Sequence, residues 1–429
     1  MHNQYKALAE RHITDRTYIR FDNAVFRTTQ ATFNWLYRKI QHNNLQPLNI
    51  QQIPPRYTGG KRKVYQRAAD FVEEHGLLKR HARIKMFVKP DKHPLCKIFD
   101  KAPRAIQYRS PEFNASLARF LIPIEEAVYS VTDMGQRCFA KGRNAQQRAQ
   151  DILSIYNSMK NPAIIELDHA KFDSCVRYEH LKRLHKFYLR CVPSRQLARL
   201  LQFQINNKGM SSHFRYKVRA TRMSGDFDTG LGNSLLNYAV ITTWLKACGV
   251  RAFVYVDGDD SLIFIEKEDL DKLDFTKIEQ YGFESEWAVK DLITAEFCKT
   301  KLVRCDPPIM VRDPYRILSH FNVALNEYGP KTWPLLLAGK AMCECVANTG
   351  VPYLEKFFQQ FITGSFLIPR EDTYKWSWVK THQRGKVTSQ AYQDLYEAWD
   401  FGVEEGLLLG TPTTYASVIR KSTQRQTKQ

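Results

Sequence analysis

Paired aspartates stand in a short acidic turn, Asp257-Gly258-Asp259-Asp260, between two apolar runs. The runs, Ala252 to Val256 and Ser261 to Ile265, are rich in β-branched and aromatic residues, and Gly and Asp interrupt them. This pattern predicts a β-hairpin. An ordinary Asp-Gly turn explains the first two residues of the turn but not Asp259 and Asp260. Two carboxylates at one hairpin tip repel each other, and a bound divalent cation would relieve that repulsion.

A second acidic group follows a short apolar strand that we expect at Ala163 to Leu167. Asp168 stands at the end of that strand, where a carboxylate can be held rigidly while it points outward. Asp173 is expected in the turn that follows. An aspartate at a strand end is more often a turn residue or a helix N-cap. Asp168 therefore indicates a metal site only in combination with the acidic hairpin.

A glycine-rich segment, Met223 to Asn233, precedes a predicted helix and carries several short polar residues. Such a loop lets main-chain and hydroxyl groups approach a sugar phosphate closely. The alternative is a structural loop in which Asn233 lies near a helix N-cap.

A basic segment runs from Arg83 to Arg109. Its first part, Arg83 to Lys89, alternates basic and apolar residues, which predicts a half-buried strand with one basic face. The remainder is interrupted by prolines and is expected to be a long basic loop. Lysines and arginines at such spacing suit anionic phosphates, and a solvated surface is the alternative.

The composition agrees with an anionic partner. The chain has 429 residues with 64 Lys and Arg against 44 Asp and Glu, a formal net charge of +20. A folded protein this basic usually binds nucleic acid, although a basic surface can also serve only to keep a protein soluble. Nine scattered cysteines without a CxxC pair predict reduced thiols and no structural zinc. No run of 18 apolar residues occurs, so we expect neither a membrane span of its own nor a signal peptide.

Periodicity predicts the elements that position these groups. A basic strand is expected at 213–222, and a polar, basic, disordered tail at 420–429. The expected helical regions are 64–80, 111–160, 178–204 with a break near Pro193, 232–247, 266–281 and much of 333–399.

Together the four segments predict one chemistry. Magnesium takes oxygen ligands and binds carboxylates together with substrate phosphates. Two such ions about 4 Å apart clamp the attacking and leaving oxygens of an in-line displacement at phosphorus. We expect Asp168 and Asp259 to hold two Mg²⁺ ions, with Asp260 in support and Mn²⁺ able to substitute. Basic side chains would neutralise a triphosphate. This combination predicts template-directed nucleotidyl transfer.

The order of these motifs resembles that of the RNA-dependent RNA polymerases of positive-strand RNA viruses, most closely the tombusvirus-like and flavivirus-like group. The resemblance runs from about Tyr57 to Val303. It implies an α+β right-hand fold with fingers, a palm whose antiparallel sheet is flanked by helices, and a helical thumb. It places an N-terminal extension and fingers at 1–160, a palm at 161–305 with a fingers insertion at about 178–222, and the thumb and basic tail at 306–429.

The resemblance also implies residue roles. Asp168, Asp259 and Asp260 are the catalytic metal ligands, and Asn233 partners Asp173 in recognising the ribose 2′-hydroxyl. Lys290 is the nearest candidate for the lysine that protonates the pyrophosphate. The expected NTP-binding residues are Lys85, Lys89, Arg104, Arg109, Asp173, Ser224, Gly225, Thr229 and Asn233.

Two departures from the family stand out. Asp228 occupies a place where the family more often has asparagine. The thumb region carries no motif that would distinguish primed from de novo initiation.

The partners implied by the resemblance are an RNA template and product strand, NTPs, and other viral replication proteins that supply membrane attachment, with no DNA. The implied location is the host cytoplasm, at membrane-associated replication complexes. One alternative is a reverse transcriptase, which usually has an aromatic residue where Gly258 stands and a bulky gate against the 2′-hydroxyl. Another is a non-catalytic RNA-binding viral protein, which suits the charge but not the three spaced carboxylates.

Overall fold

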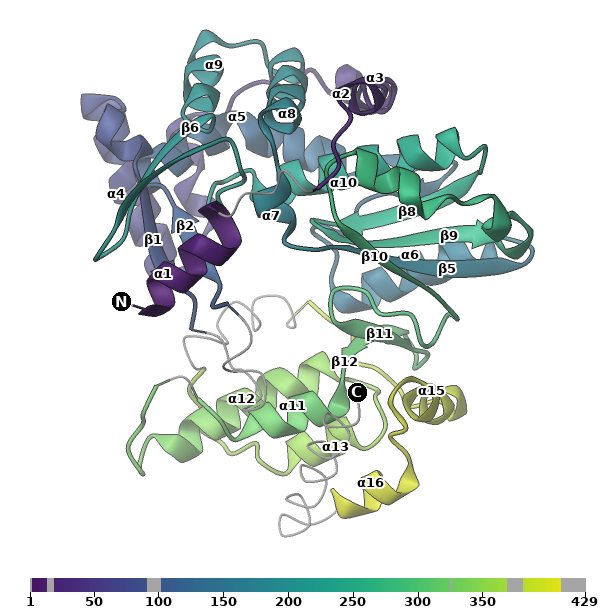
Figure 1. Ribbon diagram of the computed structural model, residues 1–429. Helices are drawn as coiled ribbons and strands as arrows, with labels where there is room; N and C mark the ends of the chain where they lie inside the picture. Colours follow the sequence, from purple (N-terminus) through teal and green to yellow (C-terminus); the bar gives the residue numbers. More distant parts are fainter. Residues whose placement is uncertain (1, 14–18, 91–101, 325, 369–380, 410–429) are drawn as a thin grey trace. The chain divides into compact units, whose positions relative to one another are not determined.

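The computed structural model describes residues 2–13, 19–90, 102–324, 326–368 and 381–409. Helices and strands are mixed along the chain, so the expectation of an α+β protein is confirmed (Figure 1). The strands are β1 (Ile84–Val88), β2 (Ala105–Tyr108), β3 (Thr132–Asp133), β4 (Gln136–Arg137), β5 (Pro162–His169), β6 (Asn206–Met210), β7 (Arg215–Arg219), β8 (Ala252–Asp257), β9 (Asp260–Glu266), β10 (Ser285–Lys290), β11 (Thr300–Val303) and β12 (Ile309–Arg312). The helices are α1 (His2–Leu8), α2 (Asn23–Arg27), α3 (Gln30–Ile40), α4 (Gly59–His75), α5 (Pro111–Tyr129), α6 (Ala145–Asn157), α7 (Phe172–Cys175), α8 (Tyr178–Cys191), α9 (Arg195–Gln202), α10 (Thr229–Ala247), α11 (Pro314–Phe321), α12 (Trp333–Ala347), α13 (Leu354–Gln359), α15 (Ser389–Trp399) and α16 (Val403–Leu408). Among the described residues, no helix combines the length and the apolar character needed to cross a bilayer.

The chain forms two compact units, each assembled from separate stretches of sequence. Unit 1 contains residues 1–141, 167–263 and 268–287. Unit 2 contains residues 142–166, 264–267 and 288–429. Every acidic residue of the predicted centre therefore lies in unit 1.

The first sheet of unit 1 has the strand order β2-β1-β6-β7. Strand β1 alternates as expected: Ile84 and Met86 are buried while Lys85 and Phe87 are exposed. The buried face packs against Ala7 and Leu8 of α1, which lies across these strands (Figure 1). The opposite face carries Lys85 and the exposed Phe87, because a strand turns successive residues to opposite sides of its sheet.

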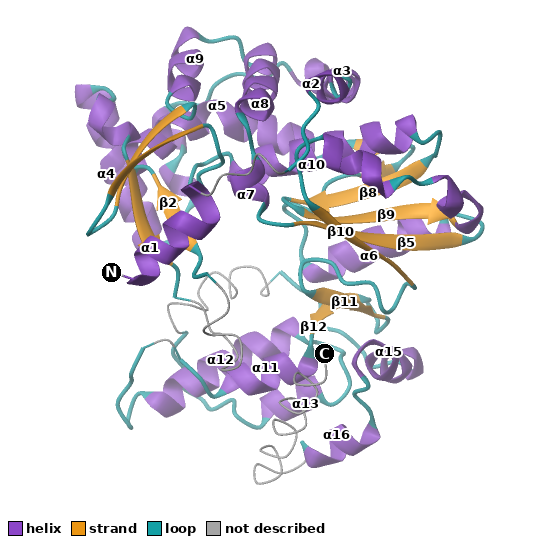
Figure 2. Cartoon of the chain, in the orientation of Figure 1, coloured by secondary structure: helices purple, strands orange, loops and turns teal. Residues whose placement is uncertain are grey.

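The second sheet has the order β10-β5-β9-β8, and its strands lie side by side in Figure 2. The division between the two units passes through β5, β9 and β10. Strands β8 and β9 are consecutive neighbours joined by Gly258 and Asp259, which confirms the predicted hairpin. Helix α10 packs against β8 and is buried on all sides from Leu231 to Leu245 except at Thr242, as expected for a helix whose apolar residues cover its whole circumference.

Local chemistry explains where several helices begin. The break near Pro193 is confirmed, because α8 ends at Cys191 and Ser194 caps α9 by accepting a hydrogen bond from the Leu197 N–H at 3.3 Å. Asn144 caps α6 in a reciprocal arrangement with Gln147.

Unit 2 has its own core beneath the β11–β12 hairpin. Val303 and Ile309 of that hairpin pack with Leu318, Phe357 and Leu395 from three helices. Arg304 and the buried Asp394 form an ion pair at 2.6 Å. The predicted helix-rich C-terminal region is therefore confirmed for the residues described, and the expected tail at 420–429 lies outside them.

Two expectations about elements were wrong. Residues 266–281 do not form one helix but two 3₁₀ segments, Lys267–Lys272 and Phe275–Gln280, within which only Ile278 is buried. Without a continuous apolar face, nothing holds this segment as an α-helix. The basic loop before Arg109 contains strand β2, because the segment from Ala105 pairs with β1.

Candidate active site

The acidic hairpin tip is held by one face of α10. Gly258 adopts a left-handed backbone conformation with φ +70°, which glycine tolerates without strain. Its N–H donates to Oγ of Ser234 at 2.8 Å. Nδ2 of Asn237 donates to the carbonyl oxygens of Gly258 at 3.2 Å and Asp259 at 3.0 Å. These hydrogen bonds fix the main chain that carries the paired aspartates.

The same asparagine connects the hairpin to strand β5. Oδ1 of Asn237 lies 3.1 Å from Nε2 of His169, and Nδ1 of His169 lies 2.8 Å from Oγ of Ser285. Burial lowers the pKa of His169 to about 4, so its ring is neutral near pH 7. Asp168 directly precedes this histidine and is the penultimate residue of β5, so the predicted position at the end of a strand is confirmed.

Asp168 and Asp259 meet at the same edge of the second sheet. Strands β5 and β9 are neighbours, and Oγ of Ser261 donates to the Leu167 carbonyl oxygen at 2.8 Å. Both aspartates are exposed residues. Desolvation of its carboxylate raises the pKa of Asp259, and the charges of Asp168 and Asp257 raise it further. The structure therefore brings these two carboxylates into electrostatic contact from distant parts of the sequence.

A lysine that the sequence did not single out lies beside the hairpin. Nζ of Lys141 is 3.2 Å from Oδ1 of Asp257, and the charge of Lys141 partly opposes the rise in the pKa of Asp259. Lys141 reaches this position because Phe139 pairs with Val256 at the edge of β8. That pairing is long-range, so no local pattern could have indicated it.

The predicted Asp173–Asn233 pair is formed. Nδ2 of Asn233, in the second turn of α10, donates to Oδ1 of Asp173 at 2.8 Å. Desolvation raises the pKa of Asp173 to about 6, the hydrogen bond from Asn233 opposes this shift, and the charge of Asp259 adds to it. Asn233 is therefore no helix cap, and the N-cap position belongs to Asp228.

The donor chemistry of the centre suits a hard divalent cation. Within the described part of the chain, no group of three or more His, Cys, Asp or Glu side chains has an arrangement that could hold a metal ion. Asp168 and Asp259 offer carboxylate oxygens, the charge of Asp168 adds to the raised pKa of Asp259, and Asp260 follows directly in the sequence. Oxygen ligands of this kind are those that Mg²⁺ prefers.

The glycine-rich segment is held by hydrogen bonds to strand β2 and by hydrogen bonds within the segment. Oγ of Ser224 accepts from the Gln107 N–H at 3.2 Å, and Oγ1 of Thr229 donates to the carbonyl oxygens of Met223 and Asp226 at 3.0 Å each. A Cβ on Gly225 would lie 2.6 Å from Cβ of Tyr108. These contacts seat the segment against β2, and Gly225 is required there by close backbone approach.

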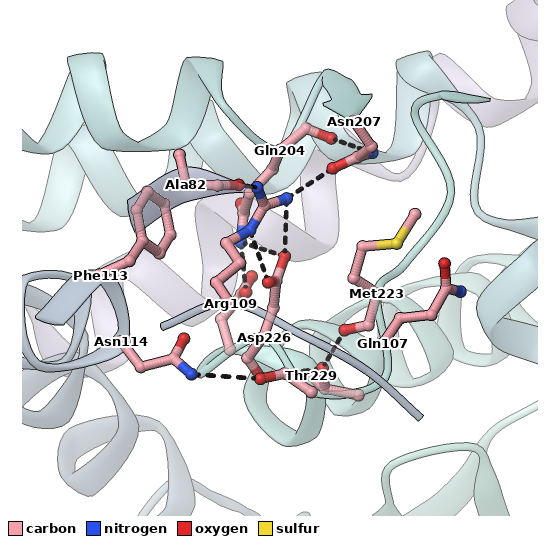
Figure 3. A network of polar contacts seen from close by, with 12 residues as sticks. Ala82, Gln107, Arg109, Phe113, Asn114, Gln204, Asn207, Met223, Asp226 and Thr229 are labelled. Atoms are coloured by element: carbon pink, nitrogen blue, oxygen red, sulfur yellow. Dashed lines mark hydrogen bonds and ion pairs between the residues drawn. The ribbon is translucent and has the colours of Figure 1, made fainter. Parts of the chain in front are cut away.

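Arg109 occupies a position that does not fit its predicted role. Its guanidinium is 1% exposed and donates from Nε to Oδ1 of Asp226 at 2.7 Å (Figure 3). It also donates from Nη1 to the Ala82 carbonyl oxygen at 2.6 Å and from Nη2 to Asn207. Because these contacts occupy a buried guanidinium, Arg109 is not available to a triphosphate, and we assign it a structural role instead.

The other predicted basic residues lie nearer the surface. Lys85 and Arg104 are exposed, and Lys89 is half-buried. Lys290 is exposed at the end of β10 in unit 2. Desolvation raises the pKa of Glu166, and the charge of Lys290 opposes that rise.

Three further residues of the site, Ser234, Asn237 and Arg222, were not predicted from the sequence. Asn237 follows Asn233 by one helical turn, and i,i+4 spacing on a predicted helix could have placed both on one face. Arg222 stands in a run of basic residues that offers no sign of its burial.

The sequence of the chain matches a known family of proteins. The family described as viral RNA-dependent RNA polymerase matches residues 2–398, and the chain belongs to that family.

Three curated relatives carry the name RNA-directed RNA polymerase. That of Tobacco necrosis virus (strain A) is 34% identical over 356 residues, which are 79% of this chain and 48% of the relative. That of Red clover necrotic mosaic virus is 30% identical over 334 residues, 74% of this chain and 43% of the relative. That of Carnation mottle virus is 31% identical over 323 residues, 71% of this chain and 42% of the relative. The chain thus spans about half the length of the curated relatives that it matches.

Proposed function

We propose that the chain synthesises RNA from NTPs on an RNA template, for the replication and transcription of a viral genome. The observation that carries this proposal is the meeting of Asp168 and Asp259 at one sheet edge. The Asp173–Asn233 hydrogen bond supports the same proposal, because Asn233 belongs to α10, the helix that also holds the hairpin tip. The names of the curated relatives support the same activity.

Each group at the centre has a proposed task. Asp168 and Asp259, with Asp260 in support, would hold two Mg²⁺ ions, and Mn²⁺ could substitute. Bound ions of this kind neutralise charge on phosphate oxygens during an in-line displacement. Asp173 and Asn233 would recognise the ribose 2′-hydroxyl.

Basic side chains would complete the reaction. Lys85, Lys89 and Arg104 would bind the triphosphate through charge-assisted hydrogen bonds. Lys290 would donate the proton that the pyrophosphate leaving group needs.

We further propose the right-hand arrangement of fingers, palm and thumb that the resemblance implies. The palm, at 161–305, would contain the β10-β5-β9-β8 sheet, and the thumb would begin near residue 306. The proposed location is the host cytoplasm, where other viral replication proteins would attach the polymerase to membranes.

A direct test measures incorporation of radiolabelled nucleotide by the purified chain on a short RNA template, with and without a primer. We expect Mg²⁺-dependent incorporation of GTP and strong discrimination against dGTP. Equal or preferred use of dGTP would favour a reverse transcriptase instead. Binding of RNA with no incorporation under either metal would favour the non-catalytic RNA-binding protein.

The exposed face of the first sheet is the surface that we propose for RNA. Lys208 and Lys217 are directly opposite each other on β6 and β7, and both are exposed. Like charges in such a pair destabilise a sheet, and a phosphate backbone would offset that cost. The same face carries exposed Phe87 and Met210, and aromatic side chains can stack on unpaired bases.

Charge reversal tests this surface. The double variant Lys208→Glu/Lys217→Glu is expected to weaken single-stranded RNA binding and to lower the slope of log K against log[salt] by about 1.4, from roughly 0.7 per phosphate contact. Fluorescence anisotropy over a salt series measures both effects. The matched control, Lys272→Glu/Lys277→Glu, reverses two exposed lysines elsewhere in unit 1. Equal slopes for the two double variants would contradict the proposal.

A further inference from the structure

A buried polar network joins the glycine-rich segment to the Asp173–Asn233 pair. Nε2 of Gln204 donates to Asp226 at 3.2 Å and to Asp228 at 2.7 Å, so it connects the Arg109–Asp226 ion pair to a second one. Figure 3 shows Gln204 next to Arg109 and Asp226. The second ion pair is Arg222–Asp228, with Nη1 to Oδ2 at 2.7 Å and side chains 1% and 0% exposed.

Arg222 contacts both members of the pair that would read the sugar. Its backbone N–H donates to the Asp173 carbonyl oxygen at 2.8 Å. Its Nε donates to Oδ1 of Asn233 at 3.2 Å. The contacts from Asp173 and Asn233 to each other and to Arg222 form a closed triangle of hydrogen bonds.

We propose that Arg222 is a positioning residue for sugar selection, which sets the orientation of the Asn233 amide relative to Asp173. This inference rests on the proposed polymerase function and deepens it. Arg222 does not touch the nucleotide in this proposal and acts only through Asn233 and Asp173.

The physical reason is the donor-only character of arginine. A guanidinium has no acceptor, so the amide group of Asn233 must turn its oxygen toward Arg222 and its NH₂ group toward Asp173. One N–H then bonds the carboxylate, and the second remains for a 2′-hydroxyl oxygen. Without Arg222 the amide can flip, which would place two acceptors, Oδ1 of Asn233 and the Asp173 carboxylate, side by side.

The backbone just before Arg222 has an unusual conformation. Ala220 and Thr221 both have positive φ, +56° and +59°, a region that L-residues other than glycine rarely adopt. The Thr221 N–H donates to the Val176 carbonyl oxygen at 3.0 Å. The two residues turn the chain after β7, so that Arg222 points inward.

Gly232 leaves the space that the guanidinium needs. A Cβ at this position would lie 2.2 Å from Nη2 of Arg222 and 3.1 Å from the Tyr188 hydroxyl oxygen. An alanine would therefore displace Arg222 without removing its charge.

Asp228 supplies the counter-charge. Desolvation alone would raise its pKa, but Arg222 and the Gln204 hydrogen bond outweigh this and lower it. An ionised Asp228 keeps Arg222 in place. This role gives a physical reason for aspartate at position 228.

The test compares sugar selection in Arg222→Met with that in Arg109→Met. Each variant removes a buried arginine from the same network, but Arg109 makes no contact with Asp173 or Asn233 among its described hydrogen bonds. The readout is the ratio of kcat/KM for an NTP to that for the matching 2′-dNTP on one RNA template, below the melting temperature of each variant. We expect Arg222→Met to lower this ratio about tenfold, the scale of one lost hydrogen bond to a charged group. Arg109→Met should leave the ratio unchanged.

Gly232→Ala provides a second variant in case Arg222→Met does not fold. It retains Arg222 and should lower the ratio in the same direction. If the folded variants keep the wild-type ratio, or if Arg109→Met lowers it equally, the positioning role is overturned. Absence of any incorporation by the wild-type chain would refute the proposed function instead, so the two failures are distinguishable.

Discussion

Asp259→Ala is expected to reduce nucleotide incorporation at least about a thousandfold, because removal of one carboxylate from the proposed two-ion centre would eliminate the charge clamp on the reacting phosphate. The same variant should bind RNA with nearly wild-type affinity, since we propose that this affinity comes from basic side chains. Asp259 is exposed, and the contacts that fix the hairpin tip use main-chain atoms. The fold should therefore tolerate the change.

The measurements are single-nucleotide extension with Mg²⁺ and anisotropy with labelled RNA. Asp271→Ala is the matched control, because it removes another exposed carboxylate from unit 1 and should retain activity. Appreciable Mg²⁺-dependent extension by Asp259→Ala would exclude the assignment of this residue. Loss of activity together with loss of RNA binding would point to a general folding defect instead.

Arg109→Met is expected to lower the free energy of unfolding by about 3 to 5 kcal/mol, the usual cost of removing one partner from a buried ion pair. Asp226 would remain as a charged group 2% exposed, without the guanidinium that faces it. Asn207 and the Ala82 carbonyl oxygen would lose their hydrogen-bond donor at the same time. A basic residue that contacted only a triphosphate would show almost no such effect.

Urea denaturation of the wild type and variant measures this difference. Arg56→Met is the matched control, because the Arg56–Glu126 pair at 2.6 Å is 39% and 60% exposed and should contribute less than about 1 kcal/mol. Arg109→Met/Asp226→Leu should regain part of the lost stability, because no unpaired charge remains buried. A variant Arg109→Met as stable as the Arg56 control, but with a raised KM for NTPs, would restore the original assignment to the triphosphate.

Much of the fold could be predicted because the relevant patterns are local. Alternation from Ile84 to Val88 identified a strand with a basic face, and Pro193 marked the break between α8 and α9. Apolar runs on both sides of Gly258 identified the hairpin. Each of these elements is encoded by the period of its own residues and by turn chemistry.

The segment 266–281 shows where local patterns fail. Its composition allows a helix, yet the structure contains two short 3₁₀ segments. Helices of this length depend on burial of an apolar face, and only the tertiary structure decides whether such a face finds a partner.

The sequence by itself determined which residue types could form an acidic centre: Asp168, Asp259 and the Asp173–Asn233 pair were all identified from their motifs. Only the tertiary structure decided which arginines are buried and which polar groups brace that centre. In the sequence, Arg109 and Arg222 look like other members of basic runs. In the folded chain they form buried ion pairs with Asp226 and Asp228, respectively. The physical reason is that burying a charge requires a counter-charge and hydrogen-bond partners at short distance, and for Arg109 those partners come from segments far away in the sequence.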